Sequence, residues 1–256
     1  FKYNIAIIPG DGIGPEVILA SLKIIRKSLE LDNIYIKEKY YPWGSTYYKK
    51  HKQMMPKDGL DKLKKHDAIF FGAVGDKNID DDITLWGLRL EICQNLDQFA
   101  NVRPSKYMEG INTPLNINIA KNIDWIIIRE NSEGEYAGSG GIVHKGLPLE
   151  MGSELAIFTR EGCRRIHEYA FKLASSRPQK HLTLITKSNA QRHGMKLWDK
   201  IFYEVSKKYP SVKVDKLLVD AATAVMVNNP EKLDVIVATN LHADILSDLA
   251  SALTGS

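Results

Sequence analysis

Short apolar runs alternate along this chain with segments of helical periodicity, and this alternation limits the possible folds more than any other feature. Residues Ile18, Leu22, Ile25 and Leu29 recur at spacings of four, three and four, which predicts one helix. Other helical patterns cover residues 56–65, 161–174, 191–208 and 242–253. Apolar runs that predict buried strands occupy residues 4–9, 68–74, 125–128, 182–185, 217–219 and 235–238. The sequence therefore predicts an α/β protein with a largely parallel sheet.

The composition excludes several other classes of protein. The 256 residues are 44% hydrophobic and 26% charged, which is typical of a globular chain and excludes a disordered or fibrous one. The net charge of +4 is small and spread along the chain, so it does not indicate nucleic-acid binding. Two cysteines, Cys93 and Cys163, are too few for a disulfide framework and favour a reducing, cytoplasmic compartment. No apolar run reaches the roughly 18 residues of a membrane span.

Charged and polar residues follow directly after four of the predicted strands. Arg129, Lys187, Asp220 and Asn240 occupy these positions. In an open parallel sheet, ligands bind just beyond the carboxyl ends of the strands. Cations and carboxylates gathered there would suit an acidic substrate and a metal ion. Each residue taken singly is more simply a solvated or capping side chain, but four together weaken that interpretation.

Asp244 and Asp248 stand four residues apart in the predicted helix 242–253. That spacing places both carboxylates on one face of the helix, one turn apart, where their like charges repel. A divalent cation would offset the repulsion, and ligands that are all oxygen favour Mg²⁺ or Mn²⁺ over zinc. The alternative is a pair of solvated acids. The apolar residues around the pair indicate a closely packed helix and favour the metal site.

The glycine-rich segment GDGIGP (10–15) follows the first predicted strand but does not match a dinucleotide-binding fingerprint. The pattern G-x-G-x-x-G needs glycine where this chain has Pro15 or Val17, and a P-loop would need G-K-S or G-K-T. The segment predicts either a tight turn or a loop whose backbone approaches a ligand. Tyr136 also has two interpretations. It is an ordinary surface residue, or it acts as an acid if Lys187 and a cation lie close enough to lower its pKa.

Six segments, in order along the chain, together resemble the β-decarboxylating dehydrogenases, which form the isocitrate/isopropylmalate dehydrogenase family. The resemblance is strongest to the tartrate dehydrogenase/D-malate dehydrogenase (decarboxylating) branch. The segments are IAIIPGDGIGPEV (5–17), LWGLRLEICQNLDQFANVRP (85–104), IIRENSEGEYAGSGG (127–141), LITKSNAQRHGMKLWD (184–199), LVDAATAVMV (218–227) and VATNLHADILSDLAS (237–251).

The resemblance implies a two-domain fold of the isopropylmalate dehydrogenase type, which is not a Rossmann fold. It implies a first domain on the cofactor side, 1–98 plus 252–256, and a second domain, 99–251, for dimerisation, metal and substrate. Residues 137–152 match the family's arm, which pairs with the partner subunit, so we expect a homodimer with shared active sites. The family continues past position 256, so we expect a first domain without its C-terminal part and without the determinant of NAD over NADP.

The resemblance also implies which residues do the chemistry. Asp220, Asp244 and Asp248 would hold Mg²⁺ or Mn²⁺. Lys187 would take the hydroxyl proton of the substrate, and Tyr136 would protonate the enol carbon. In this family, the residues equivalent to Asp220 and Lys187 come from the neighbouring subunit.

Substrate and cofactor contacts follow from the same resemblance. Arg103 and Arg129 would bind substrate carboxylates, for which the guanidinium fork is well suited. Ile13 and Asn189 would contact NAD, with Asn189 near the nicotinamide. The implied reaction is an NAD-dependent, metal-dependent oxidative decarboxylation of a small 2-hydroxyacid.

One position departs from the family pattern. Many members carry an arginine ten residues before the position of Arg103, and this chain has Cys93 there. If residues 84–95 are helical, Arg89 shares a face with Cys93, so we predict that Arg89 binds substrate. Trp86 would leave room only for hydrogen or hydroxyl on the substrate, which favours D-malate or tartrate. Packing of Trp86 in a domain core is an equally simple alternative.

Two other functions stay open on the sequence. One is a 3-isopropylmalate dehydrogenase of the same family. The other is a non-catalytic, dimeric regulatory subunit that binds a citrate-like acid. Such a subunit is expected to lose the proton-transfer pair, so the presence of both Tyr136 and Lys187 argues against it.

Overall fold

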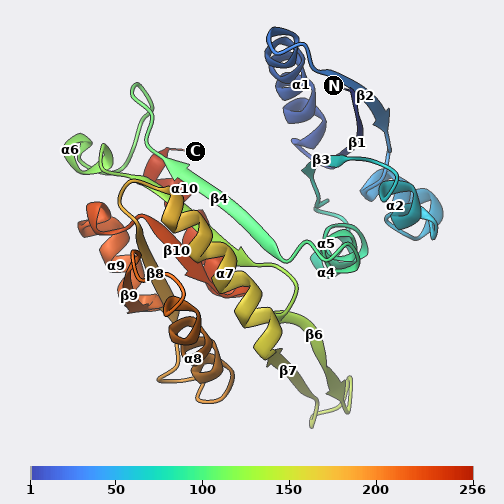
Figure 1. Ribbon diagram of the computed structural model, residues 1–256. Coiled ribbons are helices and arrows are strands. Elements are labelled where there is room, and N and C mark those ends of the chain that lie inside the picture. Colours follow the sequence, from blue (N-terminus) through green and yellow to red (C-terminus); the bar gives the residue numbers. More distant parts are fainter. Residues whose placement is uncertain (1, 256) are drawn as a thin grey trace. The chain divides into compact units, whose positions relative to one another are not determined.

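The computed structural model describes residues 2–255, and the chain divides into two compact units, Phe1–Asp97 and Gln98–Ser256 (Figure 1). Both units combine helices with a mainly parallel sheet, so the predicted α/β class is confirmed. Within residues 2–255, no helix has both the length and the apolar character needed to cross a membrane.

The first unit contains a three-stranded parallel sheet in the order β2-β1-β3. Its strands are β1 (Lys2–Gly10), β2 (Tyr35–Tyr40) and β3 (Ala68–Ala73). Alternate residues of β1 enter different cores, because successive side chains of a strand point to opposite faces. Ile7 packs against α1 (Gly14–Leu31), whereas Ala6 and Ile8 enter the opposite core. That core is covered by α2 (Ser45–His51), α3 (Gly59–Leu63) and the helical segment 81–95.

The segment that carries Trp86 and Arg89 is helical, but it is not a single α-helix. α4 (Asp81–Thr84) leads into the π-helix η1 (Leu85–Leu90), and α5 (Glu91–Asn95) follows. A π-helix bonds each N–H five residues back, so its turns are wider than those of an α-helix. The prediction that Arg89 and Cys93 share a helix face assumed a regular α-helix. In the structure the junction between η1 and α5 lies between these two residues.

The second unit contains a five-stranded sheet in the order β4-β5-β10-β8-β9. The strands β5 (Asp124–Glu130), β10 (Val235–Ala238), β8 (His181–Thr186) and β9 (Lys213–Leu218) are parallel, as predicted. β4 (Ala100–Lys106) runs antiparallel to β5 and was not predicted.

Two helices cover each face of this sheet (Figure 1). α7 (Arg160–Ser176) and α8 (Gly194–Ser206) pack on one face, around Phe171 and Trp198. α9 (Val219–Asn228) and α10 (Asn240–Thr254) pack on the other face, around Trp125. α8 begins three residues later than its pattern predicts, because residues 187–193 form turns. Two short helices, α6 (Ile117–Ala120) and the 3₁₀-helix η2 (Pro230–Lys232), complete the unit.

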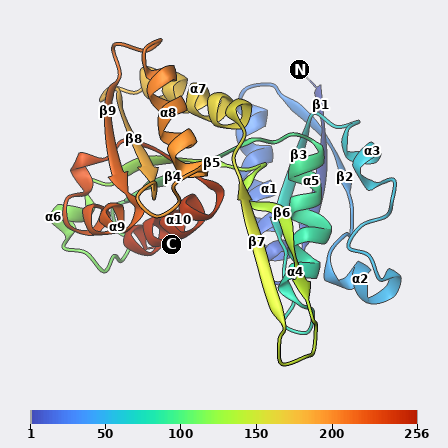
Figure 2. The same cartoon turned by 90° about the horizontal axis from the view of Figure 1, so that it is seen from below.

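The glycine-rich stretch 134–152 lies in a β-hairpin that extends away from the sheet of its unit (Figure 2). β6 (Gly134–Val143) pairs antiparallel with β7 (Met151–Ile157), and every residue of β7 is exposed. The sequence pattern showed no such strands, although the predicted arm, 137–152, falls within this hairpin. Leu253, in the last turn of α10, packs in the hydrophobic core of the second unit. The family domain to which residues 252–256 belong stays a prediction.

Candidate functional site

Four strands of the second unit present their carboxyl ends at one edge of the sheet. β5, β10, β8 and β9 are parallel, so the residues that follow them share this edge. β4 is antiparallel, and its Asn101 lies opposite Arg129, so the beginning of β4 reaches the same edge. The convergence of strand ends that the sequence predicted is therefore present in the structure.

Arg103, Arg129 and Asp244 form a cluster at this edge, which we call the arginine–aspartate cluster. Arg103 lies on β4, Arg129 near the end of β5, and Asp244 in the second turn of α10. Both arginines donate through Nη1 to Oδ1 of Asp244, Arg103 at 3.2 Å. Arg103 also donates to Ser247 Oγ at 2.5 Å. One carboxylate thus holds two guanidinium groups from neighbouring strands.

Arg129 is the most deeply buried member of this cluster, with only 1% of its side chain exposed. A buried charge is stable only if it is paired and hydrogen-bonded. Its Nε donates to Oδ1 of Asn240 at 2.8 Å, in addition to the bond to Asp244. The ring of Tyr136 lies 5.5 Å from the guanidinium carbon, within the range of a cation–π contact. Tyr136 on β6 and Asp244 on α10 therefore contact the same buried cation.

Lys187 and Asp220 form a second group, which we call the lysine–aspartate pair. Lys187 follows β8, Asp220 lies in the first turn of α9, and Lys187 Nζ donates to Asp220 Oδ1. The hydrogen bond from Lys187 lowers the pKa of the Asp220 carboxyl below its usual value. The Asp220 side chain is 64% exposed, so this pair lies at the surface of the unit. Asn189, two residues after Lys187, is also exposed.

The three aspartates predicted as metal ligands do not form one group within a single chain. Asp244 is paired with the two arginines, Asp220 is paired with Lys187, and Asp248 is exposed on the next turn of α10. Across residues 2–255, no three His, Cys, Asp or Glu side chains lie close enough together to hold a metal ion. Of the three aspartates, only Asp244 and Asp248 share an element, α10, and the metal site they were predicted to form stays a prediction.

Two acids, Glu130 at the end of β5 and Glu133 in the loop that follows, fix that loop and the start of α7, and sequence reasoning missed both. Glu130 is buried, which raises the pKa of its carboxyl, and donors on Ser132 and Glu133 oppose that shift. Glu133 accepts hydrogen bonds from the N–H and hydroxyl of Thr159, at 2.9 and 2.8 Å, where α7 begins. The sequence shows only that this segment is acidic. Glu130 bonds within the segment, whereas the partner of Glu133 lies 26 residues further along the chain.

Two further residues, Glu135 on β6 and His242 in the first turn of α10, were also missed. Glu135 accepts hydrogen bonds from Thr239 and Leu241. His242 is buried, and no hydrogen-bond partner for its Nδ1 lies among the described residues. Burial lowers the pKa of His242, the Glu135 carboxylate raises it, and Lys187 lowers it. His242 therefore lies near both Glu135 and Lys187, and Lys187 is one of the predicted site residues.

The glycine-rich turn of the first unit is fixed by a buried aspartate. Asp11 accepts hydrogen bonds from the N–H and hydroxyl of Ser45, each at 2.7 Å, and from the N–H of Gly75 at 3.1 Å. Gly14 lies so close to β3 that a Cβ would lie 2.7 Å from Ala73 N. The turn therefore has a structural requirement for its glycines, and it leaves Ile13 exposed at the start of α1. Asp11 was not singled out from the sequence.

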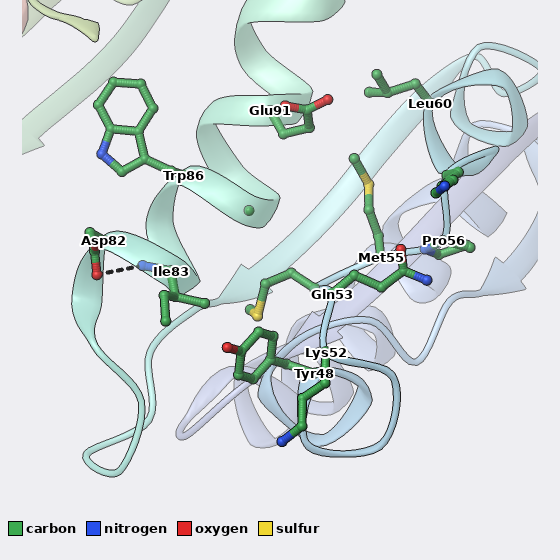
Figure 3. Close-up of a pocket in the computed structure, with 13 residues that line it drawn as sticks. Tyr48, Lys52, Gln53, Met55, Pro56, Leu60, Asp82, Ile83, Trp86 and Glu91 are labelled. Atoms are coloured by element: carbon green, nitrogen blue, oxygen red, sulfur yellow. Dashed lines mark hydrogen bonds between the residues drawn. The ribbon is translucent and has the colours of Figure 1, made fainter.

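Trp86 lines a pocket of about 480 Å³ within the first unit. Figure 3 shows its indole at one side of this pocket, across from Tyr48 and Met55. The residue is 38% exposed, so it does not pack in the core. Arg89 does not line this pocket. The predicted contact of Trp86 and of Arg89 with substrate stays a prediction.

Sequence comparison assigns the chain to a family. The profile of the isocitrate/isopropylmalate dehydrogenase family matches residues 4–256. The chain belongs to this family. As such it is an enzyme, a decarboxylating dehydrogenase, and the resemblance of the six sequence segments is confirmed.

Individual relatives in this family are similar over the whole chain. The Agrobacterium vitis protein named "Probable tartrate dehydrogenase/decarboxylase" is 61% identical over 256 residues, which cover 100% of this chain and 72% of that protein. The D-malate dehydrogenase (decarboxylating) of Escherichia coli is 42% identical and covers 99% of this chain, over 71% of its own length. A crystal structure of isocitrate dehydrogenase from Methylococcus capsulatus superposes with a TM-score of 0.87 at 31% identity, covering 99% of this chain and 71% of that one.

Proposed function

We propose that this enzyme catalyses the NAD-dependent, divalent-metal-dependent oxidative decarboxylation of a small 2-hydroxyacid, D-malate or tartrate. The observation that carries the proposal is the arginine–aspartate cluster, which joins a buried guanidinium, a carboxylate and Tyr136 at the ligand-binding edge of the sheet. The relatives named for tartrate and D-malate support this substrate class.

Arg103 is suited to bind a substrate carboxylate. Its Nε and Nη1 are hydrogen-bonded, which leaves Nη2 without a partner among residues 2–255. The guanidinium is therefore held in a fixed orientation with one terminal nitrogen available, which favours recognition of a carboxylate. Arg129 is enclosed, so we infer that it adds positive potential beneath the same carboxylate and holds Asp244 and Tyr136 in place.

Lys187 and Tyr136 supply the proton transfers in this proposal. Lys187, in its neutral amine form, would take the proton of the substrate hydroxyl, and NAD, when bound, would accept the hydride from the carbon that carries this hydroxyl. After CO₂ has left, Tyr136 donates a proton to the enol carbon. Lys187 is held by Asp220, and Tyr136 is held against Arg129, so each group has a fixed neighbour that orients it.

A divalent cation fits the donor set at this edge. The carboxylates of Asp244 and Asp248 lie one turn apart on α10, and Asp220 would complete an all-oxygen set typical of Mg²⁺ or Mn²⁺. When bound, such an ion stabilises negative charge on the substrate oxygen. Because Asp220 pairs with Lys187 and not with α10 in one chain, we propose that Asp220 and Lys187 act in the site of a partner subunit.

The remaining predictions follow from the family and stay part of this proposal. They comprise a homodimer that pairs through the β6–β7 hairpin, a first domain of 1–98 plus 252–256, a second domain of 99–251, and a cytoplasmic location. The exposed apolar side chains of the hairpin, which include Ile142, Leu155 and Ile157, support the pairing surface. Ile13 and Asn189 are both exposed, so each is accessible to NAD. Arg89 is proposed as a second substrate-binding arginine.

The function is tested by NADH formation with D-malate, the tartrates, isocitrate and 3-isopropylmalate, each with Mn²⁺ and with EDTA. We expect turnover of D-malate or tartrate that EDTA abolishes. Preferred turnover of 3-isopropylmalate would replace the substrate assignment, and activity that survives complete removal of divalent metal would overturn the mechanism. An Arg89→Ala variant with unchanged KM and kcat would remove Arg89 from the substrate site.

A further inference from the structure

The carboxylate of Glu135 connects the strand of Tyr136 to the first turn of α10. It accepts a hydrogen bond from Thr239 Oγ1 at 2.8 Å and another from the backbone N–H of Leu241 at 3.1 Å. The first N–H groups of a helix have no partner within the helix, and negative charge is favoured beside them. Glu135 therefore acts as a remote cap of α10, and Tyr136 is the next residue along β6.

A second set of contacts fixes the same junction from the opposite side. Asn240 Nδ2 donates to the main-chain oxygen of Glu133 at 3.2 Å, and Asn240 Oδ1 accepts from Arg129. Gly134 has a φ of +80°, and a Cβ there would lie 3.7 Å from Cβ of Asn240. The turn that precedes Tyr136 is thus held against the start of α10, and only a glycine suits its left-handed backbone.

We propose that Glu135 is a positioning residue for the reaction, because it sets the separation between Tyr136 and the carboxylates Asp244 and Asp248. Both carboxylates lie in the second and third turns of the helix that Glu135 caps. A shift at the first turn therefore moves both carboxylates relative to the tyrosine. This inference rests on the proposed roles of Tyr136 and of the two aspartates.

The chain offers a matched control for this role. Glu133, two residues earlier, accepts hydrogen bonds from the N–H and hydroxyl of Thr159, the residue that precedes α7 and caps it through its hydroxyl. α7 carries none of the proposed site residues. Loss of either acid removes a carboxylate with two hydrogen bonds from the same turn, but only Glu135 acts on the helix of Asp244 and Asp248.

The test compares Glu135→Ala and Glu135→Gln with Glu133→Ala in the full chain. For Glu135→Ala we expect kcat to fall about 10- to 100-fold, because small displacements of reacting groups have effects of this size, while KM changes little. Mn²⁺ affinity, measured by calorimetry without substrate, should fall about tenfold. Hydrogen exchange should become faster at the start of α10 in Glu135→Ala and at the start of α7 in Glu133→Ala.

Several outcomes would overturn the proposal. Equal losses of kcat in Glu135→Ala and Glu133→Ala would show general loosening, and an unchanged kcat in Glu135→Ala would show no positioning. If alanine at 135 prevents folding, Thr239→Val and Thr239→Ser give the same test, since valine removes the hydroxyl donor and serine keeps it. We expect kcat to fall in the valine variant and to stay near wild type in the serine variant; equal values would contradict the role. A wild-type chain that binds no Mn²⁺ and turns over no 2-hydroxyacid would instead overturn the proposed function, and hydrogen exchange would still report the cap.

Discussion

The arginine–aspartate cluster and the lysine–aspartate pair lie at the same edge of one sheet, but they are built differently. In the cluster, Arg129 is almost completely enclosed and Asp244 accepts hydrogen bonds from two guanidinium groups. In the pair, Lys187 is 29% exposed and Asp220 is mostly exposed, and among residues 2–255 neither forms a salt bridge except to the other. The cluster is therefore preorganised within its own chain, whereas the pair remains accessible to a ligand or to a second chain.

This difference predicts that substitutions in the two groups have different effects on folding stability and on activity. Removal of one partner from a buried ion pair strongly destabilises a fold, because the other charge remains buried. Exposed ion pairs contribute little, because water and salt screen them. Substitutions in the cluster should therefore reduce both stability and activity, and substitutions in the pair should reduce activity alone.

The largest effect is expected for Lys187→Met, which removes the proposed proton acceptor. We expect kcat/KM to fall by about 10²- to 10⁴-fold, with almost no change in the denaturation midpoint. Steady-state kinetics and urea denaturation of the same preparation measure both quantities. Lys216→Met is the control, because Lys216 also pairs with an aspartate, Asp199, at 3.4 Å and is exposed. Equal activity in the two variants would remove Lys187 from the reaction.

The next largest effect is expected for Arg129→Met, which leaves Asp244 with one arginine in place of two. The free energy of unfolding should fall by about 1–3 kcal/mol, because the buried Oδ1 of Asn240 loses its hydrogen-bond donor. Arg103→Met is the control within the cluster, and its loss should be clearly smaller because Arg103 is partly exposed. Urea denaturation followed by circular dichroism measures both. Equal losses would show that burial does not distinguish the two arginines.

The third prediction concerns the two groups acting across a subunit boundary. Asp220→Asn and Asp244→Asn homodimers should each be inactive. If a site combines Asp244 of one subunit with Asp220 of the other, a heterodimer of the two variants contains one intact site. Random mixing makes half of the dimers heterodimers, so about a quarter of wild-type activity should return. Activity after co-expression or subunit exchange measures this, and no recovery would place both groups in a site within one chain.

The sequence predicted the strand ends of this site well and the surroundings of each residue poorly. Arg129, Lys187 and Asp220 were placed at one edge because parallel strands share an end, which depends only on chain order and periodicity. The partners Glu135–Leu241 and Asp11–Ser45 join residues 106 and 34 positions apart. Such contacts depend on how packed elements meet, so no local pattern identifies them. The π-helix around Arg89 was also missed, since its apolar spacing is compatible with an ordinary helix.

The smallest expected effect is the pH dependence of the stability that the lysine–aspartate pair contributes. It tests most directly whether the charges of this pair are exposed. The hydrogen bond from Lys187 lowers the pKa of Asp220 in the folded chain, whereas in the unfolded chain the carboxyl has its ordinary value of about 3.9. On acidification the unfolded state therefore binds this proton first, so the stabilisation is complete above that value and is lost as the pH falls through the folded pKa.

The small difference in denaturation midpoint between wild type and Lys187→Met should accordingly be present at pH 7 and disappear in strong acid. It should also shrink in high salt at pH 7, because exposed charges are screened. In an Asp220→Asn background, Lys187→Met should have no effect on the midpoint at either pH, which assigns the dependence to this pair. A difference that persists in acid would mean that Lys187 stabilises the fold through its packing and not through its charge, and the contrast between the pair and the cluster would then fail.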